Sequence, residues 1–156
     1  PQQQLTQADF PASVREVVLS GCLGRKKAFC FFTGKDKALA EEKMRKMEIL
    51  DLADRCYREL SGGQKQRVLL ARSMCAAKEM MLLDEPVTGL DPTATEEFYA
   101  TVKQLHREGL TVVMISHDPE KALSSATHVL HLGQSMLYFG KTDGYDRGQI
   151  LLKEEH

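Results

Sequence analysis

Hydrophobic residues in the first part of the chain recur at helical spacing. Val14, Val17 and Val18 fall on one face of a predicted short helix. Ser13 precedes them as a capping residue, and Gly21 follows them as a residue that can end the helix. The pattern therefore predicts a first helix within this apolar segment.

Two longer helices are predicted next. Residues from Asp36 to about Met47 are rich in Ala, Lys, Glu and Met, which favour a helix. After a short turn at residues 50–55, Ser61 can cap a further helix that runs to about Cys75. A basic and aromatic connector, GRKKAFCFF, precedes these helices, and its aromatic side chains either belong to the core or form an exposed rim.

After Cys75 the pattern changes to alternating strands and helices. The run MMLLD at residues 80–84 is apolar up to its last residue, as expected of a buried parallel strand. The other expected elements are a helix from Pro92 to about Glu108, a buried strand at 110–116, a short helix at 118–126 and strands at 127–133 and 135–140. This order predicts a helical lobe followed by part of an α/β sheet.

Composition narrows the functional classes. The 156 residues suffice for one domain with a core, and 21 Lys plus Arg against 22 Asp plus Glu give no overall attraction to nucleic acid. No apolar run approaches the roughly 18 residues of a membrane helix, and the first ten residues do not resemble a signal peptide. The four cysteines are scattered without a Cys-x-x-Cys pair, which indicates reduced, structural thiols.

The stretch SGGQ, residues 61–64, opens a predicted helix with little side-chain bulk. Gly62 and Gly63 allow the backbone to approach a ligand closely, and Ser61 offers a hydroxyl group. The free N–H groups and the dipole of a helix start favour an anion. The stretch is therefore a candidate phosphate-binding segment, with a flexible turn before a helix as the alternative.

Two acidic residues end the predicted strand at residues 80–84. Asp84 would lie at the carboxyl edge of the sheet, where α/β proteins bind ligands, and its carboxylate suits a Mg²⁺ ion. Glu85 would face an attacking water as a general base. Two acids in a surface loop are the alternative.

Two further polar residues follow in the same half of the chain. Asp91 precedes Pro92. The sequence alone favours the interpretation that Asp91 is an acidic residue at the start of a helix and has no further function. His117 ends the second predicted buried strand, where it is either structural or a hydrogen-bond donor to a γ-phosphate.

In their order and spacing these motifs resemble the nucleotide-binding subunit of ABC transporters. The stretch LSGGQKQR is similar to the family signature, MMLLDEP to Walker B, GLDP to the D-loop, ISHD to the H-loop and Pro1-Gln2 to the Q-loop. Within the family, FPASVREVVLSG and ATHVLHLGQSMLYFG most resemble zinc or manganese importers. The resemblance implies a P-loop NTPase (RecA-like) core with an α-helical subdomain.

One motif of that family is missing from the sequence. No stretch has the form G-x-x-x-x-G-K-[ST], because Phe29 and Ser135 stand where the first Gly belongs in the two stretches that contain a Gly-Lys pair. We therefore expect a truncated ABC ATPase domain over residues 1–156, with a helical subdomain at 3–72 and an α/β core at 73–156. We also expect it to be inactive alone and to expose apolar surface on an incomplete sheet.

The resemblance assigns ATP and Mg²⁺ as cofactors and gives four residues a role in hydrolysis. Asp84 would support Mg²⁺, and Glu85 would polarise the attacking water. His117 would contact the γ-phosphate. Gln2 would sense the metal ion and the water and relay their state to the helical lobe.

The resemblance also implies that a second group of residues acts across a dimer. Ser61, Gly62, Gly63 and Gln64 would bind the γ-phosphate of ATP held by the partner subunit. Asp91 would help to communicate between the two subunits.

Partners and location follow from the same resemblance. It implies a second ATPase subunit in a head-to-tail dimer, integral membrane permease subunits held by the helical lobe, and indirectly an extracellular metal-binding protein. The protein would be cytoplasmic and peripheral on the inner face of the cell membrane, without nucleic acid. The alternatives are an ABC protein that acts on DNA or ribosomes, and a catalytically incompetent module that lends its signature to a complete partner.

Overall fold

The chain forms two compact units, Pro1–Ile115 and Ser116–His156. The computed structural model describes residues 11–25, 31–116 and 118–146. The division into a helical subdomain at 3–72 and an α/β core at 73–156 stays a prediction.

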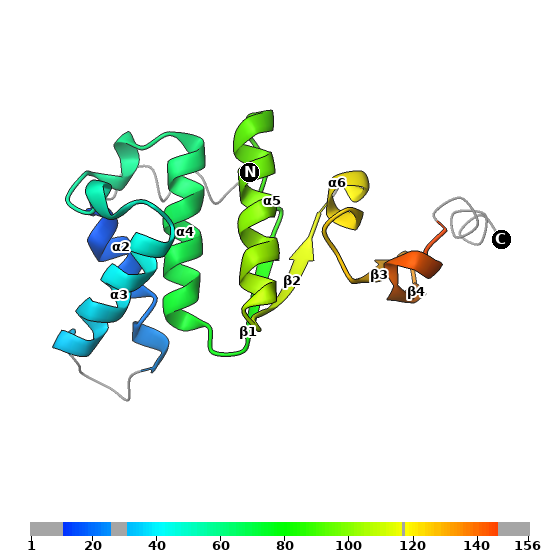
Figure 1. The fold of residues 1–156 in the computed structure, drawn as a ribbon, viewed down its shortest axis with the longest axis horizontal. Helices are drawn as coiled ribbons and strands as arrows, with labels where there is room; N and C mark the ends of the chain where they lie inside the picture. The colour runs from blue at the N-terminus through cyan, green and yellow to red at the C-terminus, as the bar shows by residue number, and fades with distance from the viewer. Residues whose placement is uncertain (1–10, 26–30, 117, 147–156) are drawn as a thin grey trace. The chain divides into compact units, whose positions relative to one another are not determined.

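The first unit is mainly helical, with α4 and α5 side by side (Figure 1). Its helices are α2 (Val14–Ser20), α3 (Gly34–Lys46), α4 (Gly62–Ala76) and α5 (Pro92–Arg107), its strands are β1 (Met80–Asp84) and β2 (Thr111–Ile115), and short 3-10 turns lie at Leu23–Arg25, Leu50–Leu52 and Tyr57–Glu59. Every helix and strand that the sequence predicts within the described part of this unit is present, with small shifts at the ends.

Capping residues determine where three helices begin. A capping box begins each of these helices, with Ser13, Thr33 or Ser61 as the cap. The side chain of the cap accepts a hydrogen bond from the backbone N–H of the third residue after it. The side chain of that third residue accepts a hydrogen bond from the backbone N–H of the cap. The predicted caps Ser13 and Ser61 are thus confirmed. The predicted start of the second helix at Asp36 is wrong, because Asp36 is the capping partner of Thr33 and α3 begins at Gly34.

The core of the first unit lies among α2, α3 and α4. Val14, Met44 and Val68 contribute one side chain from each of these helices and are completely buried. Cys22 and Cys75 are buried in the same core, which agrees with the structural role predicted for them.

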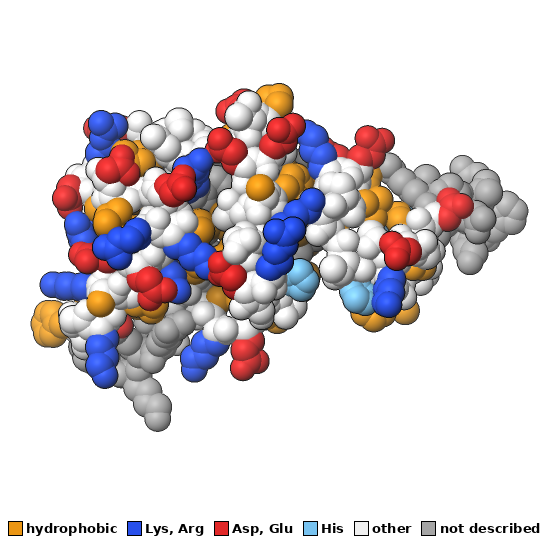
Figure 2. All heavy atoms as spheres, in the orientation of Figure 1, with side chains coloured by type: hydrophobic (Ala, Val, Ile, Leu, Met, Phe, Trp, Pro, Cys, Tyr) orange, Lys and Arg blue, Asp and Glu red, His pale blue; other side chains and the backbone are white. Residues whose placement is uncertain are grey.

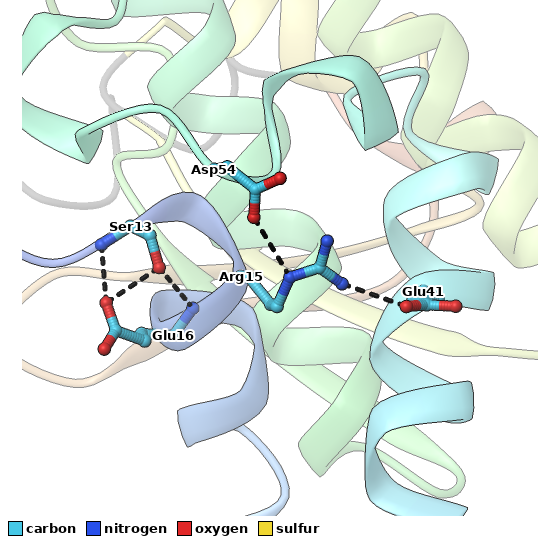
Figure 3. A network of polar contacts seen from close by, with 5 residues as sticks. All are labelled: Ser13, Arg15, Glu16, Glu41 and Asp54. Atoms are coloured by element: carbon cyan, nitrogen blue, oxygen red, sulfur yellow. Dashed lines mark hydrogen bonds and ion pairs between the residues drawn. The ribbon is translucent and has the colours of Figure 1, made fainter. Parts of the chain in front are cut away.

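Polar contacts and one close backbone approach hold α2 against its neighbours. Arg15 donates from Nη1 to Glu41 on α3 at 2.9 Å and from Nε to Asp54 at 3.3 Å (Figure 3). At the end of α2, a Cβ placed on Gly21 would lie 2.1 Å from the carbonyl oxygen of Arg72 on α4. The absence of a side chain at Gly21 therefore allows the two helices to meet.

The strands β1 and β2 pair in parallel, as predicted. The prediction that both strands are buried is wrong, because only one face of the pair is covered among the described residues. Met81 and Leu83 pack into the core, whereas the residues that alternate with them in β1 are exposed. In the described residues only one face of the pair is covered, so the other exposes apolar side chains, as expected of an incomplete sheet. Those exposed are Met80 (61%), Leu82 (66%), Val113 (44%) and Ile115 (53%).

The second unit consists of a short helix and a hairpin. Its elements are α6 (Pro119–Leu123), β3 (His128–Leu132), β4 (Met136–Lys141) and a 3-10 turn at Thr142–Gly144, with β3 and β4 antiparallel. The Gly-Lys-Thr stretch at residues 140–142 spans the end of a hairpin strand and a 3-10 turn. It does not join a strand to an α-helix, so its geometry differs from that of a phosphate-binding loop.

The surface carries charges of both signs and exposed aromatic side chains. On the face shown in Figure 2, basic and acidic side chains are interspersed. Phe31 is 98% exposed and Phe32 is 36% exposed, which excludes a core position for Phe31. Among the described residues, no helix has the length and apolar character needed to cross a bilayer.

Candidate functional site

The start of α4 presents a hydroxyl group and two glycines. Ser61 Oγ accepts a hydrogen bond from the Gln64 N–H at 3.3 Å, and the Ser61 N–H donates to Gln64 Oε1 at 3.0 Å. Gly62 and Gly63 supply the next two N–H groups, which have no acceptor within the helix. These groups and the helix dipole are suited to an anion.

The hydroxyl proton distinguishes this cap from the other two. In α2, Ser13 Oγ donates to Glu16 at 2.7 Å, and this bond holds the pKa of Glu16 below its usual value. In α3, Thr33 Oγ1 donates to Asp36 at 2.6 Å. Within the described part of the chain, Ser61 Oγ donates to no protein group, so its proton is available to a ligand.

The start of α5 is capped by Asp91. Asp91 Oδ1 accepts a hydrogen bond from the Ala94 N–H at 2.9 Å, and Pro92 is the first helical residue. The structure therefore gives Asp91 the helix-capping position that the sequence alone favoured. Asp91 also lines a groove between α4 and α5.

A groove lies between the N-terminal parts of α4 and α5. At its mouth the helices approach closely, because a Cβ on Gly63 would lie 3.3 Å from Ala94 Cβ and a Cβ on Gly62 would lie 3.5 Å from Leu90 Cδ2. The lining residues are Ser61, Gly62, Gly63, Gln64, Gln66, Arg67 and Leu70 from α4 and its cap, and Leu90, Asp91, Thr93, Ala94, Glu97, Phe98 and Thr101 from α5 and the loop before it.

An ion pair joins the two walls of this groove. Arg67 Nη2 lies 2.7 Å from Glu97 Oε2 on α5. Arg67 Nη1 lies 3.6 Å from Glu48 Oε2, in the turn that follows α3. Arg67 and Glu97 stand 30 positions apart in the sequence, so no local pattern reveals their contact.

The second group of candidate residues lies at the end of β1. Asp84 is the last residue of the strand and is exposed. Glu85 follows with a positive φ of 43°, and its N–H donates to the Ile115 carbonyl at 3.0 Å. The Glu85 carboxylate accepts a hydrogen bond from Thr88 Oγ1 at 3.3 Å, which holds it over its own loop.

The structure thus separates the predicted residues into two groups. Residues 61–64 and Asp91 line one groove, whereas Asp84 and Glu85 do not line it. The other two candidates, Gln2 and His117, lie outside the described residues.

Comparison with known families identifies the chain. The sequence profile of the family described as ABC transporter matches residues 2–88, which include the signature stretch and the Asp-Glu pair. This chain belongs to the ABC transporter family. Asp91 and His117 lie beyond the matched residues.

Curated relatives of this ABC transporter chain include metal-transport proteins. It is 34% identical over 152 residues to the zinc uptake system ATP-binding protein ZurA of Listeria monocytogenes, with 94% of the chain and 59% of that protein covered. It is 36% identical to the zinc transport system ATP-binding protein AdcC of Streptococcus pneumoniae, with 80% of the chain and 54% of that protein covered. The chain therefore spans little more than half the length of these relatives.

Solved ABC transporter structures share the fold. An inward-facing transporter of the metal-chelate type aligns with a TM-score of 0.86 and 28% identity, with 93% of this chain and 59% of that chain covered. An ATP-binding cassette in its ADP conformation aligns with a TM-score of 0.76 and 22% identity, with 91% of this chain and 63% of that chain covered, and shows the fold alone. The predicted P-loop NTPase fold of ABC type is confirmed.

The donor set at the end of β1 fits a magnesium ion. Among the described residues, no group of three or more His, Cys, Asp and Glu side chains could enclose a metal ion. Magnesium in nucleotide sites commonly takes one or two carboxylates and completes its shell with water and phosphate oxygens. The exposed carboxylate of Asp84 is sufficient for that kind of coordination.

Proposed function

We propose that this chain acts as the ATP-binding and ATP-hydrolysing part of an ABC importer for a metal ion, zinc or manganese. The single observation that carries the proposal is the start of α4, where Gly62, Gly63 and the unused proton of Ser61 face an open groove. The names of the curated relatives support the class of cargo.

The γ-phosphate of ATP held by a second ATPase subunit is the proposed ligand of the α4 start. Ser61 would donate its hydroxyl proton, and Gly62 and Gly63 would donate their N–H groups. That Asp84 and Glu85 do not line this groove supports an arrangement in which the two groups serve different nucleotides. Asp91, which lines the same groove, would help to communicate between the two subunits.

The residues at the end of β1 would act in hydrolysis. Asp84 would hold Mg²⁺, which supplies charge neutralisation at the phosphates when bound. Glu85 would accept a hydrogen bond from the attacking water and orient it. Gln2 and His117 keep the roles that the resemblance assigns them, as contacts of the metal ion and the γ-phosphate.

The proposed partners are integral membrane permease subunits and, through them, an extracellular metal-binding protein. The exposed side chain of Phe31 supports a permease contact next to α3, because a nearly fully exposed aromatic residue is suited to burial by a partner. The proposed location is the cytoplasmic side of the cell membrane, without nucleic acid. The alternative of a catalytically incompetent module gains no support from the comparisons.

Titration of the ¹⁵N-labelled chain with Mg-ATP tests the proposal. We expect weak binding, because no stretch of the sequence forms a phosphate-binding loop, and we expect no ATP hydrolysis by the chain alone. The amide resonances of Gly62 and Gly63 should shift with Mg-ATP and not with AMP, which lacks the terminal phosphate. Shifts around Lys141 instead, or equal shifts with AMP, would contradict the proposed site.

Matched variants test the contribution of the Ser61 hydroxyl group. Ser61→Ala should weaken the binding about tenfold, because it removes a donor to a charged acceptor, whereas Ser61→Thr should retain it. Ser13→Ala removes the equivalent cap hydroxyl from α2 and should leave Mg-ATP binding unchanged.

A further inference from the structure

The groove between α4 and α5 is held at two points along its length. At the mouth, the backbone of Gly63 approaches Ala94 so closely that a Cβ there would lie 3.3 Å from the alanine Cβ. Further along, the guanidinium of Arg67 meets the carboxylate of Glu97 at 2.7 Å. Arg67 lies six residues beyond Ser61, about 9 Å along the helix axis.

We propose that Arg67 is a positioning residue that sets the width of the groove through its ion pair with Glu97. The proposal rests on the proposed function, since the groove is the site where the γ-phosphate would bind. The Ser61 hydroxyl and the Gly62 and Gly63 N–H groups line the same groove, so its width sets how they meet a ligand beside the start of α5.

The end of α3 adds a restraint on the same guanidinium. Glu48 follows α3 with a φ of 55°, and its carboxylate lies 3.6 Å from Arg67 Nη1. A planar guanidinium can meet two carboxylates at once with separate nitrogens, which a lysine ammonium does less well. Arg67 therefore connects the segment after α3 with both walls of the groove.

The exposure of these side chains argues for positioning over stability. The side chains of Arg67, Glu97 and Glu48 are 36%, 53% and 82% exposed. Ion pairs this accessible to water contribute little to the free energy of folding. The proposed role of the pair is therefore the positioning of the two helices and not the stability of the fold.

Glu97→Gln gives a test in which positioning and simple electrostatics predict opposite results. Removal of a negative charge from the groove wall would by electrostatics alone strengthen the binding of a phosphate. If Arg67 needs Glu97 to hold the helices in place, the same change weakens binding. We expect the affinity for Mg-ATP, followed at the Gly62 and Gly63 amides, to fall about fivefold.

The control is Glu96→Gln, the same chemical change on the adjacent exposed residue of α5. It should alter neither the affinity nor the two glycine resonances. The melting temperature of Glu97→Gln should change by less than about 4 °C, as expected for a surface pair. Reversal of the pair, Arg67→Glu with Glu97→Arg in a Glu48→Gln background, should restore the resonances of the ligand-free protein.

The outcomes distinguish this inference from the proposed function. Unchanged or tighter binding of Mg-ATP by Glu97→Gln would overturn the positioning role while the proposed function stands. If the wild-type chain shows no ATP-dependent shifts, the proposed function fails, and the ligand-free spectra then decide the inference. Glycine resonances that move in Glu97→Gln but not in Glu96→Gln would support it, and identical spectra would overturn it.

Discussion

Glu85 holds a backbone conformation that L-residues rarely adopt. Its φ of 43° lies in the left-handed region, where the Cβ crowds the backbone. The hydrogen bond from its N–H to the Ile115 carbonyl and the turn closed by the Thr88 N–H hold it there. Strain of this kind often marks functional positions, which fits the role proposed for Glu85 in orienting water.

Two substitutions that both remove the carboxylate measure this strain. Glu85→Ala keeps a Cβ in the left-handed region, whereas Glu85→Gly removes it. We expect the glycine variant to have the larger free energy of unfolding, by about 1 kcal/mol, in urea denaturation. Equal stability of the two variants would mean that the conformation carries no strain.

The contact between α2 and α4 depends on a missing side chain. Gly21 has an ordinary helical φ of −62°, so the backbone conformation does not require a glycine there. The requirement is steric, because a side chain would not fit. A Cβ there would overlap the Arg72 carbonyl at 2.1 Å and crowd Cys75 Cβ at 3.0 Å. Because the first obstacle is backbone, no change of rotamer can relieve it.

Gly21→Ala should therefore push α2 away from α4. We expect a loss of about 3 kcal/mol in the free energy of unfolding, measured by urea denaturation. Gly24→Ala is the matched control, since no heavy atom lies within 4 Å of a Cβ at that position. Its effect should stay within about 0.5 kcal/mol, and a similar loss in both variants would show that helix packing is not the cause.

At the scale of the whole molecule, the uncovered face of β1 and β2 is the main feature. Leu82 and Val113 are partners across the parallel pair, and both are exposed beside Met80 and Ile115. A contiguous apolar face of this kind on a soluble protein tends to be buried against another surface. The isolated chain is therefore expected to self-associate.

Sedimentation velocity over a range of protein concentrations tests this expectation. The wild-type chain should show a sedimentation coefficient that rises with concentration. Leu82→Lys with Val113→Thr should shift it toward the monomer, because the pair forms the centre of the exposed face. Leu23→Lys, which replaces an exposed leucine outside the sheet, should not. A wild-type chain that stays monomeric at all concentrations would contradict the prediction.

The sequence predicts the elements of this fold well because their signals are local. Ser13, Ser61 and Pro92 mark helix starts through contacts within one turn, and the structure has helices beginning at each. The start of α3 was missed because Asp36 is typical of the first residues of a helix. Thr33, the actual cap, is followed by Gly34, and glycine disfavours a helix. Such an error of two residues leaves the fold unchanged.

Contacts between distant segments could not be predicted in the same way. The run MMLLD shows that strand β1 is apolar, but not which of its faces is covered, because that depends on the neighbouring elements. The motifs identify Ser61 and Asp91 separately, whereas their place in one groove and the ion pair of Arg67 with Glu97 arise only from the packing of α4 on α5.

The neutral cap of α4 has a consequence for the response to acid. Glu16 has a lowered pKa in the folded chain, so its contribution to the α2 cap is complete above its usual pKa and is lost as pH falls through the lowered one. Gln64 has no proton to gain, and its hydrogen bonds with Ser61 do not depend on pH. Acidification should therefore loosen the start of α2 while the start of α4 keeps its shape.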